Sequence, residues 1–243
     1  TGTITNDDAA PSFSIGDASI TEGGQVSFTV TRTGDAQASQ TVNVATSIGG
    51  GDTAAVGDFT ATGPTTLTFA TGEVSKTFTV QTTADTVLEA DETFTATLSS
   101  ATGGAVIGDG TATGTITNDD AGPTVTAVAD VSAAEGADLA FAVTLSGSAE
   151  IATTQSIALA DVTTSSGDYG TRSYSDGVTE SPAGTLNIPA NVSSFTVTVA
   201  GAQDALLEDD ETFTVTVGGT QSGTGTITND DAAPSFSIGD ASI

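Results

Sequence analysis

A seven-residue motif, GTITNDD, occurs three times in this chain and constrains its fold more than any other feature. Its copies begin at Gly2, Gly114 and Gly225, so they lie 112 and 111 residues apart. Self-similarity at a fixed long period indicates repeated structural modules. A module of about 110 residues can bury a core of its own, because roughly two-thirds of its unfolded surface would leave water. We therefore expect two full modules rather than one large domain.

The two ends of the chain carry the same twenty residues, at 1–20 and 224–243. This identity predicts a window from a longer tandem array. The expected units are the last strand of a preceding repeat (1–8), module 1 (9–120), module 2 (121–231) and the first strand of a following repeat (232–243). Each junction holds two small residues followed by a proline, at Pro11, Pro123 and Pro234. Linkers this short and stiff predict a semi-rigid rod.

Short runs in which apolar residues alternate with Thr, Ser or Asn fill both modules, as at Val26/Phe28/Val30 and Phe213/Val215/Val217. A period of two predicts antiparallel strands with one buried face. Gly-rich turns separate the runs, and about seven short strands in each module indicate an all-β fold of Greek-key β-sandwiches. Two helix-like patches, 87–92 and 206–211, are too short to persist as helices and are expected to be loops.

The charge balance is strongly acidic, with 31 Asp and Glu against three basic residues and a net charge of −28. Such a surface repels nucleic acid and anionic lipid. The sequence holds no 18-residue apolar run, so no direct membrane insertion is expected. It also lacks Cys and His, which removes disulfides and the usual zinc ligands. A bound metal should therefore be a hard, oxygen-preferring cation, with Ca²⁺ ahead of Zn²⁺.

The composition also disfavours an enzyme. Without His or Cys there is no ordinary nucleophile–base pair, and the single lysine, Lys76, has no evident activating pocket. Composition leaves a glycosidase with paired carboxylates as an alternative. The same carboxylates recur in both modules, however, which suits a repeated structural site better than one active centre.

The acidic residues recur at matching places, at strand ends and in loops. Carboxylates within about 4 Å of each other repel by roughly 4 kcal/mol per pair at an effective dielectric of 20, so such clusters need protons, water or a cation. Four motifs recur in the same order in both modules: Glu-Gly, Gly-Asp-Phe/Tyr, Asp-x-x-x-Glu-x-x-Glu and Asn-Asp-Asp. In this order and spacing they resemble the Calx-beta domain, over both modules and the two partial ends.

The resemblance implies a seven-stranded, immunoglobulin-like β-sandwich that binds Ca²⁺ at one tip. It implies metal ligands in module 1 at Glu22, Asp58, Asp85, Glu89, Asp91, Glu92, Asp119 and Asp120. It implies metal ligands in module 2 at Glu135, Asp168, Asp204, Glu208, Asp210, Glu211, Asp230 and Asp231. The chain departs from the pattern at Ala84 and Gln203, where many members carry an acid before the acidic loop. Asp176 and Asp209 lack counterparts and are expected to be solvated surface charges.

Near-identical repetition, short linkers and high acidity favour a calcium-stiffened segment of a large secreted protein: an adhesin shaft, matrix fibre or surface filament. Its expected location is extracellular, at a bacterial cell surface. Its expected partners are neighbouring repeats of the same chain, with lateral or end-to-end self-association. One alternative is a calcium-sensing regulatory module. Another is an adhesive domain that binds a ligand through module 2, which is nine residues longer than module 1 between Asp168 and Leu186 and carries Arg172 and Tyr174 there.

Overall fold

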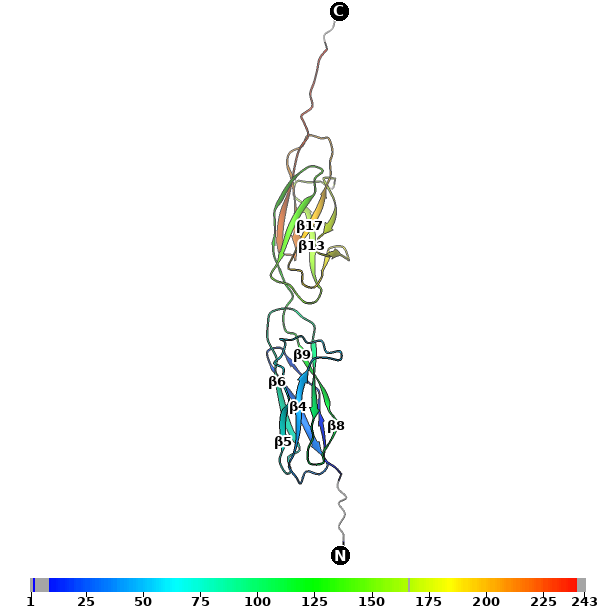
Figure 1. Ribbon diagram of the computed structural model, residues 1–243. Coiled ribbons are helices and arrows are strands. Elements are labelled where there is room, and N and C mark those ends of the chain that lie inside the picture. Colours follow the sequence, from blue (N-terminus) through cyan, green and yellow to red (C-terminus); the bar gives the residue numbers. More distant parts are fainter. Residues whose placement is uncertain (1, 3–8, 166, 240–243) are drawn as a thin grey trace, which may run out of the picture. The chain divides into compact units, whose positions relative to one another are not determined.

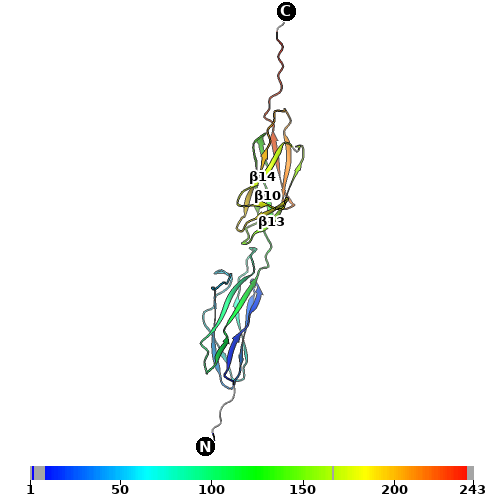
Figure 2. The ribbon, with the colours of Figure 1, turned by 90° about the vertical axis from the view of Figure 1, so that its right-hand side faces the viewer.

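The computed structural model describes residues 2, 9–165 and 167–239, and its regular structure is entirely β (Figures 1 and 2). The chain divides into two compact units, 1–120 and 121–243. Among the described residues, no helix is long and apolar enough to cross a membrane. The two helix-like patches, 87–92 and 206–211, have no helical structure, as the sequence predicts, and the last residue of each, Glu92 and Glu211, begins a strand.

Module 1 is a sandwich of two sheets with strand orders β6-β3-β1-β8 and β2-β9-β7-β4-β5. Its strands are β1 (Ser12–Ile15), β2 (Ala18–Thr21), β3 (Gln25–Thr33), β4 (Gln40–Ser47), β5 (Thr65–Phe69), β6 (Ser75–Gln81), β7 (Glu92–Ser99), β8 (Val106–Asp109) and β9 (Thr111–Thr117). The chain crosses between the sheets from β3 to β4 and from β6 to β7, which gives the expected Greek-key arrangement. The first predicted strand is split into β1 and β2, one in each sheet.

The core of module 1 is built on phenylalanines. Phe28 meets Phe94 edge-on at 5.9 Å between ring centroids, and Phe59 stacks on Phe94 at 4.2 Å. Such aromatic pairs stabilise beyond the area that they bury. This packing explains the glycine of the repeated GTITNDD motif. A Cβ on Gly114 would lie 2.5 Å from Phe94 Cζ, which is too close for any side chain. In module 2 a Cβ on Gly225 would meet Phe213 at 2.7 Å.

Module 2 repeats this plan with strand orders β10-β12-β17-β14 and β11-β19-β18-β13-β16-β15. Its strands are β10 (Val125–Val128), β11 (Val131–Ala134), β12 (Leu139–Leu145), β13 (Thr153–Asp161), β14 (Tyr169–Tyr174), β15 (Thr179–Glu180), β16 (Thr185–Ile188), β17 (Ser194–Gly201), β18 (Glu211–Val217) and β19 (Gln221–Thr228). The alternating apolar positions of the sequence all fall in these strands, and most are buried.

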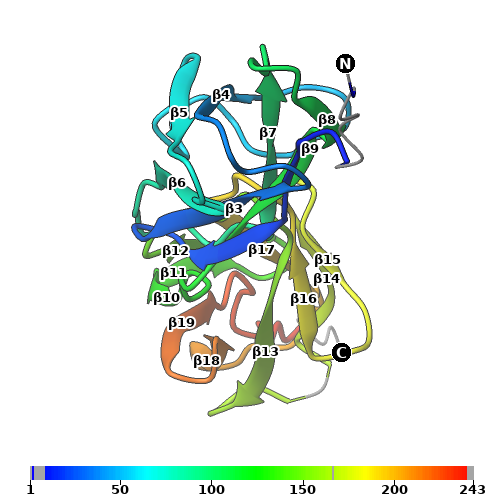
Figure 3. The same cartoon turned by 90° about the horizontal axis from the view of Figure 1, so that it is seen from below.

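The additional residues of module 2 form strands, where a loop is the ordinary expectation for an insertion. β14 adds to the edge of one sheet beside β17, and β15 adds to the edge of the other beside β16 (Figure 3). Arg172 on β14 donates to Glu180 on β15 at 2.8 Å, and the Tyr174 hydroxyl donates to the same carboxylate. The insertion therefore joins the edges of the two sheets.

The expected first strand of a following repeat behaves differently from its identical copy, Pro11–Gly16. Residues 232–239 form no strand, and Phe236 and Ile238 are almost fully exposed. Their counterparts Phe13 and Ile15 are buried, because β1 lies between β3 and β8. The other expected terminal strand, residues 1–8, lies outside the described residues except for Gly2.

Candidate metal centres

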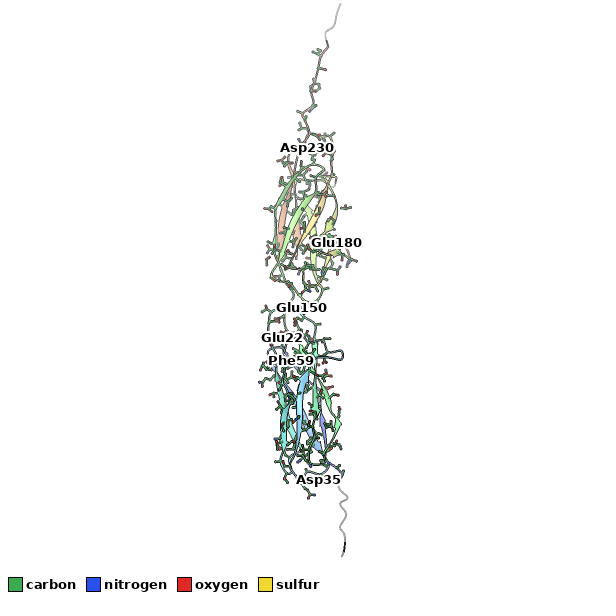
Figure 4. The ribbon with its side chains drawn as sticks, in the orientation of Figure 1. Glu22, Asp35, Phe59, Glu150, Glu180 and Asp230 are labelled. Atoms are coloured by element: carbon green, nitrogen blue, oxygen red, sulfur yellow. The ribbon has the colours of Figure 1, made fainter. Side chains whose placement is uncertain are left out.

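One end of module 1 collects the acidic residues from separate parts of the sequence. Glu22 follows β2, Asp120 follows β9, and Asp85 lies between β6 and β7. β2 and β9 run parallel, so their carboxyl ends lie together, and the Glu22 N–H donates to the Thr117 carbonyl at 3.1 Å. Figure 4 shows Glu22 near this end, which we name the acidic end of the module, and Asp35 at the opposite end.

A cavity of about 240 Å³ lies at the acidic end of module 1, and five of the predicted ligands line it. These are Glu22, Asp58, Asp85, Glu89 and Glu92. Oxygens of Glu22, Asp85 and Asp120 also lie within 4.8 Å of one another. Carboxylates this close repel one another unless protons, water or a cation offset the repulsion.

Aspartates in the loops that follow β4 and β13 reach these ends because the next residue is an aromatic anchor. Phe59 stacks on Phe94, and Tyr169 stacks on Phe213 at 4.4 Å. The carboxylate of Asp58 accepts the Ala55 N–H, so its side chain is held by its own loop. Asp168 accepts the Ser165 N–H in the same way.

The remaining two predicted ligands of module 1 lie beside the cavity. Asp91 accepts the Asn118 N–H at 3.2 Å, so its carboxylate holds the exit of β9. Asp119 is exposed, and its backbone N–H donates to Glu22 Oε1 at 3.3 Å. Neither side chain is among the cavity-lining residues or in the three-carboxylate group.

Module 2 places its acidic residues in the same way, with Asp230 at one end and Glu150 at the other (Figure 4). Its cavity is smaller, about 40 Å³, and its acidic lining residues are Glu135, Asp168, Asp204, Glu208, Asp209 and Glu211. Oxygens lie within 4.8 Å of one another in two groups: Glu135, Asp230 and Asp231, and Asp168, Glu208 and Glu211. Asp210 accepts the Asn229 N–H at 3.3 Å, as Asp91 does in module 1. Asp209, expected to be a solvated surface charge, lines the cavity, whereas Asp176 does not.

The comparisons with known proteins bear on these two ends. A family profile of the Calx-beta domain matches residues 6–121 and again residues 127–234. The chain belongs to the Calx-beta family. Calx-beta domains are calcium-binding modules, and this chain carries two of them in tandem. No curated protein matches the chain.

Solved structures similar to this chain include two from the same family. The apo form of the Calx CBD1 domain is 24% identical with a TM-score of 0.42, and the match covers 46% of this chain and 100% of that one. CBD12 from CALX1.2 is 20% identical with a TM-score of 0.42, and the match covers 84% of this chain and 79% of that one.

An asparagine missing from the predicted ligand set organises each Calx-beta acidic end. Asn118 Oδ1 accepts the Glu89 N–H at 2.9 Å, and its Nδ2 donates to the Asp120 carbonyl at 3.1 Å. Asn229 makes the equivalent bonds to Glu208 at 3.0 Å and to Asp231 at 3.1 Å. Each asparagine therefore ties the acidic loop to the residues that follow the last strand. Its place in the repeated Asn-Asp-Asp motif was the signal that could have identified it.

The pKa values of acidic residues in module 2 reflect burial and the repulsion between clustered carboxylates. Burial, a hydrogen bond with Asp168 and nearby negative charges raise the pKa of Glu211 to about 7. Burial alone would raise the pKa of Asp168 as well, but the Ser165 N–H and the hydrogen bond with Glu211 lower it. The pKa of Glu135 is raised by desolvation and by the charges of Asp231, Asp204 and Asp230. Without a cation, Glu211 is therefore the member of the Asp168–Glu211 pair that takes up a proton first as pH falls toward neutrality.

The donor set of both Calx-beta acidic ends fits a hard divalent cation. Every candidate ligand is a carboxylate oxygen, and Ca²⁺ takes six to eight oxygens in flexible geometry. Among the described residues, Asp120 Oδ2, Glu135 Oε2 and Asp231 Oδ2 are buried without a hydrogen-bond partner. Buried polar atoms are normally satisfied, so these three oxygens are available as ligands for a cation.

The three basic residues of the chain are engaged away from the acidic ends. Lys76 pairs with Glu73 at 2.7 Å, and Arg172 pairs with Glu180. Arg32 is buried and donates to carbonyls of Ala38 and Ala70 and to Gln40 Oε1. The positive charge of these three residues is thus committed elsewhere and does not neutralise the acidic ends.

Proposed function

We propose that this chain is a calcium-binding structural segment of a large secreted cell-surface protein, in which Ca²⁺ rigidifies tandem Calx-beta modules at their tips and junctions. The observation that carries the proposal is the buried, unpartnered carboxylate oxygen that recurs at equivalent positions, Asp120 in module 1 and Asp231 in module 2. Each lies in a group of three acidic side chains, drawn from three separate segments in module 1 and from two in module 2. A structural site repeated in each module supports a structural role for the whole segment.

In module 1, Glu22, Asp85 and Asp120 would hold an ion, and Asp58, Glu89 and Glu92 surround the adjoining cavity. In module 2 the two carboxylate groups defined above would serve. Bound Ca²⁺ supplies positive charge that replaces carboxylate repulsion with attraction. The chain's own residues hold the ligands in place, because the side chains of Asn118 and Asn229 hydrogen-bond to the backbone of the acidic loop and of the last acidic residue.

The junction supports stiffening as well as binding. Asp120 directly precedes the linker Ala121-Gly122-Pro123. Its carbonyl is already held by Asn118, and its Oδ2 belongs to the three-carboxylate group. A cation on that group would restrain the first residues of the linker, since the same residue contributes both the ligand and the start of the connection.

An extracellular, bacterial cell-surface location and self-association are part of the same proposal. Extracellular modules typically bind Ca²⁺ at about 10⁻⁴–10⁻³ M, where the ion is plentiful outside cells. A net charge of −28 keeps copies apart until cations neutralise the ends, so lateral or end-to-end association would depend on calcium. The alternative of an adhesive insertion has less support, because Arg172 and Tyr174 are both bound to Glu180 within the module.

The test is thermal unfolding of the chain in excess EDTA and in millimolar calcium, with magnesium at the same concentration as a control. At millimolar calcium and a dissociation constant of about 10⁻⁴ M, a ligand that binds only the folded state stabilises it by about 1.4 kcal/mol per ion. For modules of this size that corresponds to a rise of roughly 6 °C in the midpoint for each bound ion.

Substitutions locate the effect. Glu22→Gln with Asp85→Asn should abolish the calcium shift of module 1 and leave that of module 2. Asp35→Asn at the opposite end of module 1 removes a charge as a matched control and should leave both shifts intact. Small-angle scattering separates a stiffener from a sensor, since a sensor changes shape strongly on binding calcium. If calcium changes neither the midpoints nor the scattering, the proposal fails.

A further inference from the structure

The two modules differ at the residue that opens the acidic loop, Ala84 in module 1 and Gln203 in module 2. The positions are equivalent, because each packs on the glycine of the Glu-Gly motif. A Cβ on Gly23 would lie 2.8 Å from Ala84 Cβ, and a Cβ on Gly136 would lie 2.6 Å from Gln203 Oε1. A methyl group in one module is thus replaced by an amide in the other.

The Gln203 amide is directed at the carboxylates of module 2. Its Nε2 donates to Asp230 Oδ1 at 3.1 Å and to the Asp204 carbonyl at 3.2 Å. Both partners are acceptors only, so the NH₂ group and not the amide oxygen must face them. A hydrogen-bond donor therefore occupies one lone pair of a carboxylate that belongs to the Glu135, Asp230 and Asp231 group.

The two modules also differ in which residues form the group of three neighbouring carboxylates. In module 1 the loop acid Asp85 joins Glu22 and Asp120. In module 2 the equivalent loop acid, Asp204, is absent from the group, and Asp230 takes its place. Gln203 donates to the backbone carbonyl of Asp204 and to the Asp230 carboxylate, so it contacts both residues that distinguish the two groups.

The cavities differ in the same direction. The module 2 cavity, which Gln203 lines, measures about 40 Å³, against about 240 Å³ in module 1. A cation that binds Asp230 Oδ1 in module 2 competes with the amide for that oxygen and enters a smaller cavity. Module 1 has no such competing amide at Ala84.

Building on the proposed calcium binding, we infer that Gln203 sets a weaker calcium affinity in module 2 than in module 1, because its amide NH₂ competes with the cation for Asp230. The array would then load in two steps as calcium rises. Module 1-type sites fill first, and module 2-type sites fill after their amide is displaced. A charge-assisted hydrogen bond at an exposed position corresponds to an affinity difference of about three- to tenfold.

The test is a calcium titration of the whole chain followed by backbone amide NMR, which reports each module separately. In the wild type, module 2 should reach half-saturation at about three- to tenfold more calcium than module 1. Gln203→Ala should lower the module 2 midpoint by that factor and leave module 1 unchanged. Ala84→Gln should raise the module 1 midpoint.

Gln203→Glu distinguishes the effect of the hydrogen-bond donor from the effect of side-chain size, because Glu has the same size as Gln but offers only acceptors. It should lower the module 2 midpoint at least as far as Gln203→Ala does. Unchanged midpoints in the Gln203 variants, or a raised midpoint in Gln203→Ala, would overturn the inference, because a raised midpoint means that the amide oxygen serves as a ligand. Absence of saturable calcium binding in the wild type would instead refute the proposed function itself.

Discussion

Asn118 is the residue whose removal tests how the acidic end of a module is held in place. Asn118→Ala deletes the bond from the Glu89 N–H, at 2.9 Å, and the bond to the Asp120 carbonyl, at 3.1 Å. Each hydrogen bond of this kind contributes about 0.5–1.5 kcal/mol, so we expect module 1 to lose about 1–3 kcal/mol. The midpoint of thermal unfolding should fall by roughly 4–12 °C.

The effect on calcium should be separable from the effect on stability. Glu89 and Asp120 bring carboxylates to the acidic end, and Asn118 positions both through their backbone. Loss of a residue that orients metal ligands typically weakens metal binding by about 10–100-fold. Asn118→Asp should behave differently, because it keeps the acceptor, loses the donor and adds a negative charge. It should destabilise module 1 more in EDTA than in calcium.

The assay is urea denaturation of the chain in EDTA and in calcium, with NMR assigning each transition to a module. Asn43→Ala provides a matched control, since the Asn43 side chain accepts a single exposed hydrogen bond from Thr66. It should change stability by less than about 1 kcal/mol. Asn229→Ala should reproduce the Asn118→Ala result in module 2. If both asparagine variants match the control in stability and in calcium affinity, the positioning role is refuted.

Three further substitutions test other parts of the fold. Gly114→Ala should destabilise module 1 by about 1–3 kcal/mol in urea denaturation, because its Cβ would overlap Phe94, whereas Gly63→Ala has open space and should be nearly neutral. Arg32→Met should destabilise module 1 by about 2 kcal/mol or more, since buried Gln40 Oε1 and two part-buried carbonyls would lose their donor, and equal stability would show that these acceptors rehydrate. Glu180→Gln should destabilise module 2 at neutral pH. Burial raises the pKa of Glu180, but hydrogen bonds from Tyr174 and Gly184 and the charge of Arg172 lower it further than burial raises it. The extra stability of the wild type over Glu180→Gln is therefore present above pH 4.5 and should shrink as pH falls below it.

The sequence predicted the fold well because its local signals agree with one another. Alternating apolar positions, such as Val26, Phe28 and Val30, lie in strands with one face buried. The repeat motif located the last strand of each module, since both β9 and β19 carry it. The split of the first strand into β1 and β2 was not predictable, because it depends on partners in two different sheets.

The insertion in module 2 shows what pattern alone cannot supply. Residues 169–174, Tyr-Gly-Thr-Arg-Ser-Tyr, lack a period-two pattern of apolar side chains, so the sequence favours a loop. Tertiary contacts decide otherwise, through pairing with β17 and the contact of two side chains with Glu180. Buried Arg32 is a similar case, since only the folded loops bring its acceptors together.

The candidate site was predictable as a set of residues but not as a geometry. Matching motifs identified the loops that meet at each acidic end. Which carboxylates share a group depends on neighbours that carry no charge, such as Gln203 and Asn118. An alignment of acidic positions alone therefore treats the two modules as equal, whereas their contacts make them different.

The grouped carboxylates lie at the acidic ends of the modules, and this placement limits which parts of the structure calcium can stabilise. Outward positions of β7 and β9 pair Thr93 with Thr115 and Thr95 with Thr113, and the Thr95 hydroxyl donates to the Asp52 carboxylate. The aromatic contacts of the cores involve no ion. The groups of three neighbouring carboxylates lie at the acidic ends, so relief of their repulsion by a cation must act there. Calcium should thus order the tips and linkers of a sandwich that is already folded, which is the property that a tunable stiffener requires.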